Sequence, residues 1–167
     1  MLIREIQATD AKGLSVLLKQ VEDSSDYMLW EPEERIFTPE NQFKMIDSVH
    51  EKENSTILLA ENRGELVGYL LAFGGNAKRN NHSAYIVIGI LSEYRGRGIG
   101  AGLFRKLEEW AAEHNIHRLE LTTVTKNEAG LSLYKKMGFE IEGTKRHSLL
   151  IDGQWLDEYY MAKLLSS

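Results

Sequence analysis

The sequence has no cysteine, only two prolines and no long apolar run. Without cysteine there is no thiol nucleophile, cysteine zinc site, redox pair or disulfide. No apolar run approaches the eighteen residues of a membrane span, and the first ten residues lack the basic start and apolar segment of a secretory signal. The net charge of −5 gives no general attraction to nucleic acid or anionic lipid. These absences predict a cytoplasmic protein with neither a nucleic-acid partner nor a membrane partner.

The composition that remains is that of an ordinary globular chain. Hydrophobic residues make up 43% of the 167 residues, and a chain of this length buries roughly 70% of the surface that its unfolded form exposes. The two prolines, Pro32 and Pro39, lie close together, and we find no low-complexity tract and no internal repeat. We therefore expect residues 1–167 to form a single domain.

Hydrophobic patterning predicts seven strands and four helices. Strands are expected at residues 2–6, 55–61, 65–74, 84–91 and 118–124 and on both sides of Asp152-Gly153. Helices are expected from Thr9 or Asp10 to beyond residue 21, around 43–49, and at 99–114 and 127–137. The run 84–91 is apolar on both faces, which predicts the most buried strand, and with the helix and strand after it forms a βαβ unit. This order predicts an α+β, or mixed α/β, fold in which helices flank a mixed sheet.

A glycine-rich segment, LSEYRGRGIGAGL at residues 91–103, joins the run 84–91 to the following helix. Its glycines are Gly96, Gly98, Gly100 and Gly102. Such a turn lets backbone N–H groups and the helix dipole meet phosphate oxygens, and Arg95 and Arg97 add two cations. A pyrophosphate cradle and a flexible loop with solvated arginines both fit this pattern. Leu103 stands where a P-loop has lysine and where a dinucleotide fingerprint has its third glycine, so neither triphosphate hydrolysis nor NAD binding is expected.

Two blocks of sequence carry a resemblance to a known family. The pattern Arg95-x-x-Gly98-x-Gly100 resembles the acyl-CoA signature Q/R-x-x-G-x-G/A of the GCN5-related N-acetyltransferase (GNAT) superfamily, and NEAGLSLYKKMGF at 127–139 is similar to a second family block. The tail from Gly138 onward resembles the branch of bacterial L-amino-acid and ribosomal-protein N-acetyltransferases. The resemblance implies a mostly antiparallel sheet with a central βαβ unit that binds acyl-CoA. It also implies acetyl-CoA as cosubstrate and no metal.

The resemblance implies where acetyl-CoA would bind. Backbone amides of the glycine-rich turn and the Arg95 side chain are expected at the pyrophosphate, and the pantetheine arm is expected to add to the edge of the strand 84–91. Asn127 maps to a position that touches this arm, although its place also suits a helix N-cap. The expected cofactor-binding residues are Ile88, Ile90, Leu91, Arg95, Arg97, Gly98, Ile99, Gly100, Asn127 and Tyr134.

The resemblance also implies two catalytic positions. Tyr134 maps to the tyrosine that protonates the departing CoA thiolate, a role that suits a phenol of pKa about 10 facing a thiolate of pKa about 8.5. Its place on a helix also fits aromatic packing. The backbone N–H of Ile90 is expected to polarise the thioester carbonyl. Because no cysteine can form an acyl-enzyme, we expect direct transfer through a tetrahedral intermediate.

The proton acceptor for the attacking amine is not singled out by spacing. The candidates are Glu33, Glu34, His82, Tyr85 and Glu120. Each has an ordinary structural reading, as a solvated acid, a hydrogen-bonded histidine or a packing residue. Relay to bulk water would need none of them.

The stretch EDSSDYMLWEPEE, residues 22–34, is both acidic and aromatic. It could attract a cationic amine and hold its alkyl part, or it could be a solvated loop anchored by its aromatic side chains. The tentative substrate residues are Tyr27, Trp30, Glu33, Glu34 and Tyr85. The final hairpin, which contains Trp155, Tyr159 and Tyr160, could close this site or pair two subunits as a homodimer.

We therefore expect an acetyl-CoA-dependent N-acetyltransferase that acetylates a primary amine of a small molecule, such as an amino acid or a polyamine. A protein N-terminal acetyltransferase and a non-catalytic acyl-CoA-binding regulatory module are the alternatives.

Overall fold

Seven strands and four α-helices make up residues 1–166, the part of the chain that the structure, a computed structural model, describes. The strands are β1 (Leu2–Glu5), β2 (Thr56–Asn62), β3 (Glu65–Gly74), β4 (Ser83–Ile90), β5 (Arg118–Val124), β6 (Glu140–Ile151) and β7 (Gln154–Leu164). The helices are α1 (Ala11–Ser24), α2 (Pro39–His50), α3 (Ile99–Glu113) and α4 (Glu128–Lys136), with 3₁₀ turns η1 (Ala8–Asp10) and η2 (Ser92–Tyr94). This order confirms the predicted one. The assignment of 1–167 to one domain stays a prediction, and its last residue, Ser167, lies outside the described residues.

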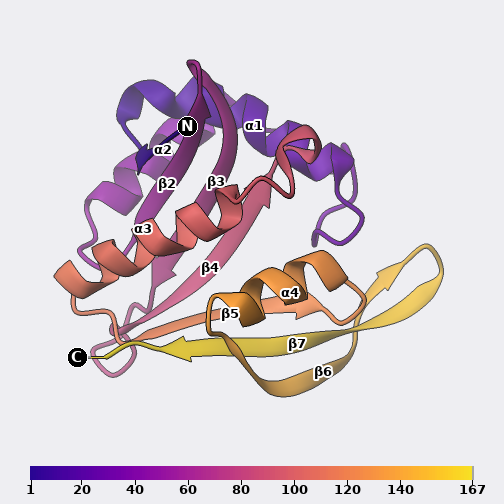
Figure 1. Ribbon diagram of the computed structural model, residues 1–167. Coiled ribbons are helices and arrows are strands. Elements are labelled where there is room, and N and C mark those ends of the chain that lie inside the picture. The colour runs from indigo at the N-terminus through magenta and orange to yellow at the C-terminus, as the bar shows by residue number, and fades with distance from the viewer. Residues whose placement is uncertain (167) are drawn as a thin grey trace.

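The strands form one mixed sheet in the order β1-β2-β3-β4-β5-β7-β6. Every neighbouring pair is antiparallel except β4 and β5, which are parallel and are joined through α3 as the predicted βαβ unit. In Figure 1, α3 crosses in front of β2, β3 and β4, α1 and α2 lie behind them, and α4 lies in front of β5 and β7. The mixed α/β fold class is thereby confirmed. None of the helices in residues 1–166 is long and apolar enough to cross a membrane.

The helices bury the faces that their patterns predict. In α1 the apolar residues recur every three or four positions, and Leu14 and Leu17 are almost completely buried against the sheet. Full burial of one such side chain contributes about 1.5–3 kcal/mol relative to exposure. In α2, Ile46 and Val49 are buried, but Phe43 is 51% exposed. The apolar face of α2 is therefore narrower than its spacing predicted.

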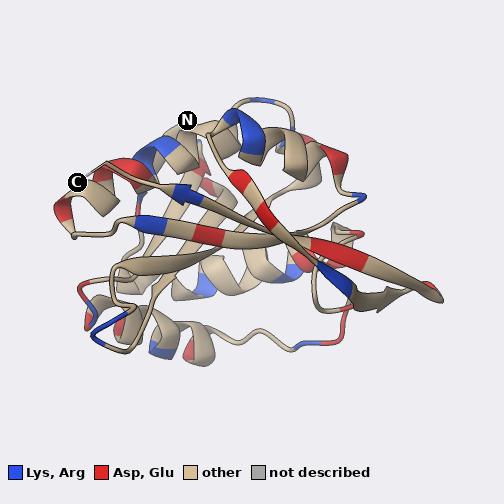
Figure 2. Ribbon diagram, turned by 90° about the horizontal axis from the view of Figure 1, so that it is seen from below, with Lys and Arg blue, Asp and Glu red and all other residues tan. Residues whose placement is uncertain are grey.

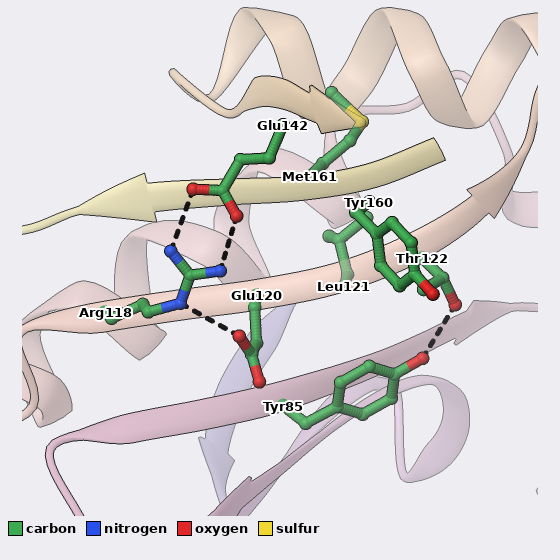
Figure 3. A pocket seen from close by; sticks show the side chains of 8 residues that line it. All are labelled: Tyr85, Arg118, Glu120, Leu121, Thr122, Glu142, Tyr160 and Met161. Carbon is green, nitrogen blue, oxygen red and sulfur yellow. Dashed lines mark hydrogen bonds and ion pairs between the residues drawn. The ribbon is translucent and has the colours of Figure 1, made fainter. Parts of the chain in front are cut away.

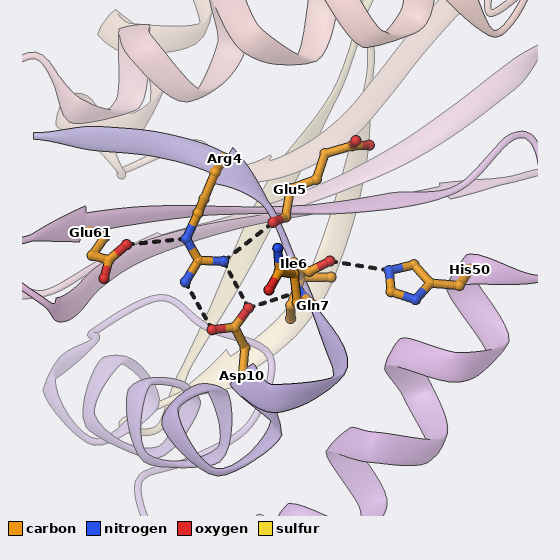
Figure 4. Close-up of polar contacts among 7 residues, drawn as sticks. All are labelled: Arg4, Glu5, Ile6, Gln7, Asp10, His50 and Glu61. Atoms are coloured by element: carbon orange, nitrogen blue, oxygen red, sulfur yellow. Dashed lines mark hydrogen bonds and ion pairs between the residues drawn. The ribbon is translucent and has the colours of Figure 1, made fainter.

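A polar network fastens β1 to its neighbours (Figure 4). Arg4 donates two hydrogen bonds to the Asp10 carboxylate, of 2.8 and 2.9 Å, and one of 3.1 Å to Glu61 of β2. These bonds to the charged form hold the pKa of Asp10 below its usual value. Asp10 stands at the predicted start of α1, but its side chain makes no cap bond there because Arg4 engages it. His50, at the end of α2, lies 3.1 Å from the Ile6 carbonyl oxygen.

The prediction that residues 84–91 form the most buried strand is wrong. The longest buried stretches lie in β2, at residues 56–60, and in β3, at residues 67–72, whereas β4 alternates between buried and accessible residues. The ladder between β4 and β5 joins only residues 83–85 to residues 118–120, after which the two strands diverge. Residues 86–90 therefore have a neighbour on the β3 side alone, and roughly 17 Å of strand edge is open.

Candidate active site

Backbone groups of β4 project into the gap between β4 and β5. Leu91 donates its N–H to Val67 at 2.9 Å on the β3 side, whereas His82 accepts from Arg118 at 3.1 Å on the β5 side. Because successive peptide groups of a strand point to alternate sides, the N–H and C=O groups of Ile88 and Ile90 face the gap. These groups can pair with an extended polar chain laid along the edge.

The glycine-rich turn lies at the carboxyl end of this open edge. Gly96 and Gly98 have φ of 74° and 82°, a left-handed conformation that other residues adopt only at a cost. The first helical bond of α3 runs from the Gly102 N–H to the Gly98 carbonyl, at 3.0 Å. Within residues 1–166, the five N–H groups of residues 97–101 have no acceptor. They form a ready binding site for an anion at the positive end of the helix dipole.

Two arginines lie beside this turn with their charges free. Arg95 and Arg97 are exposed, and neither forms an ion pair with any described residue. The Arg97 guanidinium lies 5.0 Å from the centre of the Tyr94 ring, and Tyr94 accepts a hydrogen bond of 3.3 Å from Asn62. The turn thus combines unpaired N–H groups with two cations, which suits a pyrophosphate.

Close packing fixes α4 against the start of α3. A Cβ at Gly100 would lie 2.7 Å from the Leu133 side chain, so the glycine is what lets the two helices approach. Asn127 accepts a hydrogen bond of 3.1 Å from Gly130 and caps α4, which confirms the N-cap reading of this residue. Tyr134 follows Leu133 in α4 and is close enough to Tyr85 of β4 for that residue to affect its pKa, which places it near the gap.

Tyr134 is held by aromatic rings and has a free hydroxyl. Its ring meets those of Phe104 and Phe139 edge to face, at 6.0 and 6.3 Å between centres. No described residue hydrogen-bonds its hydroxyl. Burial, with a smaller contribution from Tyr85, raises the pKa of Tyr134 to about 12, so the phenol is protonated at neutral pH. The Tyr134 ring can therefore pack against aromatic neighbours while its protonated hydroxyl stays available as a hydrogen-bond donor.

A cavity of about 320 Å³ adjoins the closed end of the gap (Figure 3). Its lining residues are Tyr85, Arg118, Glu120, Leu121, Thr122, Glu142, Tyr160 and Met161. The Tyr85 hydroxyl lies 2.8 Å from that of Thr122. Arg118 binds both oxygens of Glu142, at 2.6 and 2.9 Å, and Glu120 at 2.9 Å. Glu120 is therefore engaged in an ion pair, which makes it a poor candidate for a free base.

The acidic loop is joined to α1 by an ion pair between the buried carboxylate of Glu22 and the exposed Arg35. Glu22 is 3% exposed, and Arg35 donates to both of its oxygens, at 3.1 and 2.5 Å. The Arg35 guanidinium lies 5.0 Å from the Trp30 ring and 4.9 Å from the Phe37 ring. Trp30 contacts Arg35 but is 40% exposed, and Tyr27 is half-buried. The loop is thus held by its ion pair with α1, and the substrate contacts expected of Tyr27 and Trp30 stay a prediction.

The remaining base candidates are not brought together. Glu33 and Glu34 are exposed at the turn of the loop. His82 precedes β4 and lies eight residues, roughly 26 Å of extended chain, from Ile90.

Viewed from below, acidic and basic residues are interspersed over the ribbon (Figure 2). Within residues 1–166, no group of three or more His, Cys, Asp and Glu is placed to hold a metal.

Sequence reasoning missed one residue of the gap. Tyr69 of β3 lies opposite Gly89 in the ladder and is 2% exposed. In the sequence it lies within the apolar run LVGYLLAF, where a tyrosine reads as core. The feature that sets Tyr69 apart from an ordinary core residue is Gly89, its partner on β4, and only the strand register shows that the two residues are paired.

An open strand edge that leads to an anion-binding helix start is the arrangement that the GNAT resemblance implied. Residues 22–139 match the family model described as "Acetyltransferase (GNAT) family". The chain belongs to this family, which confirms the predicted family and enzyme class. Solved structures with this fold include complexes with acetyl-CoA.

Individual relatives agree with the predicted branch. The chain is similar to the L-amino acid N-acetyltransferase AaaT of Escherichia coli (strain K12), with 35% identity over 102 residues. That alignment covers 60% of this chain and 63%, less than two thirds, of the relative. A GNAT-family acetyltransferase from Streptococcus pneumoniae superposes with a TM-score of 0.94, at 31% identity and 99% coverage of both chains. A ribosomal-protein-alanine N-acetyltransferase from Brucella melitensis gives 0.87 at 28% identity, covering 99% of this chain and 100% of the other.

Proposed function

We propose that this chain transfers an acetyl group from acetyl-CoA directly to the primary α-amine of a small molecule, with an amino acid as the acceptor. The observation that carries the proposal is the open edge of β4, which leads from the gap to the five free N–H groups of residues 97–101. A thioester on a long polar arm that ends in a pyrophosphate fits an edge and an anion site arranged in this way.

In the proposed reaction, the amine nitrogen bonds to the acetyl carbon as the bond between carbon and sulfur breaks. The Ile90 N–H, which faces the gap, donates to the carbonyl oxygen as it gains negative charge. Tyr134 donates to the sulfur as it gains negative charge, and the nitrogen loses its proton to water. The sulfur takes up a proton in exchange for the one that the nitrogen loses, so a neutral amine and acetyl-CoA give the acetylated amine and the CoA thiol with no net release of a proton.

The choice of an α-amine follows from the state of the candidate bases. Glu22 and Glu120 are paired with arginines, and His82 lies at the far end of β4. A chain-terminal α-amine of pKa about 8 is about half neutral at pH 8 without a dedicated base, whereas an alkyl amine of pKa about 10.4 is almost entirely protonated. An α-amine therefore suits the site better than the alkyl amines of a polyamine do.

The similarity to an L-amino acid N-acetyltransferase supports a free amino acid as the acceptor. The similarity to a ribosomal-protein-alanine N-acetyltransferase favours a second candidate, the N-terminus of a protein. Both acceptors present a primary α-amine, so the chemistry at the gap is the same. A cytoplasmic location, a homodimer and the lack of a nucleic-acid partner remain parts of the proposal that rest on the sequence.

Release of CoA thiol from acetyl-CoA at pH 8 tests the proposal, with free amino acids, polyamines and N-terminal peptides as acceptors. We expect selective turnover of free amino acids. Turnover of a peptide alone would move the assignment to a protein N-terminus. Saturable acetyl-CoA binding without turnover of any amine would contradict catalysis and favour a regulatory module.

A further inference from the structure

Tyr69 lies in a position that only a glycine neighbour permits. It is paired with Gly89 of β4, and a Cβ at Gly89 would lie 2.6 Å from Cε1, Cζ and Oη of the Tyr69 ring. The end of the ring, with its hydroxyl, therefore lies directly over the Gly89 backbone. The neighbours of Gly89 along the strand, Ile88 and Ile90, are the two residues whose N–H groups face the gap.

The Tyr69 hydroxyl has no protein partner. Its side chain is more than nine-tenths buried, and no residue within 1–166 hydrogen-bonds its oxygen. In contrast, the Tyr85 hydroxyl is hydrogen-bonded to Thr122, and the Tyr94 hydroxyl accepts a hydrogen bond from Asn62. Thr123 Oγ1 is the only fully buried side-chain oxygen or nitrogen within residues 1–166 that lacks a partner, so the Tyr69 hydroxyl keeps some contact with solvent although its ring is buried. Because the fold gives this accessible hydroxyl no partner, it is available to bind a ligand beside β4.

Tyr69 and Tyr134 approach the gap from opposite faces of the sheet. A Cβ at Gly68 would meet Ile99 of α3, so residue 68 faces α3 and Tyr69, the next residue of β3, faces the other side. Burial is the main cause of the raised pKa of Tyr69, and Glu22, Arg35 and Tyr134 also act on it, so its hydroxyl lies near groups on both faces of the sheet. Tyr134 belongs to α4, on the α3 side.

We propose that the Tyr69 hydroxyl binds the acceptor amine and directs its lone pair at the acetyl carbon. The inference rests on the function proposed above. A neutral primary amine carries two N–H donors and one lone pair. When one N–H donates to the Tyr69 oxygen, the lone pair is free to face the carbonyl carbon, which the Ile90 N–H holds in the gap. An acceptor that enters from the Tyr69 face attacks on the side away from Tyr134, which leaves Tyr134 free to meet the sulfur.

Tyr69 has the chemistry of a binding group and not of a base. Burial raises the pKa of its phenol above the ordinary value of about 10, so the hydroxyl keeps its proton through the assay range. Its oxygen can accept a hydrogen bond from the amine without removing a proton. The shape of the pH profile of kcat/KM should therefore not depend on Tyr69.

The substitution Tyr69→Phe tests the proposal, because it keeps the ring and removes only the hydroxyl. We expect KM for the acceptor to rise and kcat/KM to fall roughly 3- to 12-fold, with the same pH profile. The Kd of acetyl-CoA should stay within twofold, and Tm should be unchanged because the hydroxyl makes no hydrogen bond to any described residue. Tyr94→Phe, which removes a partnered hydroxyl beside the glycine-rich turn, is the matched control and should leave the acceptor KM within twofold.

The two proposals fail in different ways. If the wild-type protein turns over an amino acid and Tyr69→Phe retains its kcat/KM within twofold, the role of Tyr69 is overturned and the proposed function stands. A fall in Tm with an equal loss of acetyl-CoA affinity would show a structural role and would also overturn it. Absence of wild-type turnover, despite acetyl-CoA binding, would overturn both.

Discussion

Replacing Tyr134 with phenylalanine removes one oxygen that no described residue binds and leaves the aromatic contacts with Phe104 and Phe139 in place. A phenol of pKa about 12 is protonated about ten thousand to one at pH 8. Complete transfer of its proton to a thiolate of pKa about 8.5 is uphill by about 3.5 pKa units, or about 5 kcal/mol. Tyr134 is therefore expected to act mainly by hydrogen bonding to the sulfur as negative charge develops.

The strength of this hydrogen bond to the sulfur sets the expected loss of rate. A hydrogen bond to a charged group contributes about 1.5–3 kcal/mol, which corresponds to roughly 10- to 150-fold in rate. We expect Tyr134→Phe to lower the rate of the chemical step by this factor, with unchanged acetyl-CoA affinity and an unchanged or slightly higher Tm. The factor should be constant from pH 7 to about 10, because the phenol loses its proton only as the pH approaches 12.

Single-turnover release of CoA thiol measures this step without interference from product release. A loss of less than threefold would refute the role of Tyr134. A loss that disappears between pH 8 and 10 would refute the assignment of its pKa. Loss of acetyl-CoA binding in equal measure would show that the hydroxyl serves binding and not the departing sulfur.

Two further predictions concern the turn before α3 and the network at β1. Gly98→Ala forces a residue with a Cβ to φ 82°, so we expect thermal denaturation to show a loss of about 1–2 kcal/mol of stability. We also expect titration to show weaker acetyl-CoA binding, and unchanged affinity would contradict the role of this turn. Arg4→Ala removes the partner that depresses the pKa of Asp10. The ion pair contributes its full stabilisation above the pKa of Asp10 in the unfolded chain, about 3.9, and loses it as the pH falls through the lower pKa of the folded state. The difference in Tm between the wild type and Arg4→Ala should therefore be largest at neutral pH and shrink below pH 4.

The sequence was sufficient for the element order and the glycine-rich turn because both depend on local signals. Helical spacing predicted α1 and α3, and the glycines at 96 and 98 adopt the positive φ that such a turn requires. The gap between β4 and β5 could not be predicted from the local pattern, and only the family resemblance led to the expectation of an open edge there. The run 84–91 is apolar on both faces, as in a fully paired strand, and no local pattern states that pairing stops at residue 85.

Long-range contacts limited the prediction of the site in the same way. Glu22 and Arg35 are 13 positions apart, and the acidic stretch that begins at Glu22 has the composition of a solvated loop, yet the Glu22 carboxylate is buried and paired with Arg35. The position of the Tyr69 ring over β4 depends on Gly89, twenty positions away, which the ladder between β3 and β4 places opposite it. The assignment of substrate contacts to Tyr27, Trp30 and the other loop residues stays a prediction.

Amide hydrogen exchange with and without acetyl-CoA tests the central claim, that the open edge of β4 and the start of α3 form the acetyl-CoA site. The account predicts that saturating acetyl-CoA slows exchange at Ile88 and Ile90, whose N–H groups face the gap, and at residues 97–101. It predicts little change at Gly89 and Leu91, whose N–H groups already face β3. Saturable binding that leaves Ile88, Ile90 and residues 97–101 unprotected would contradict the account.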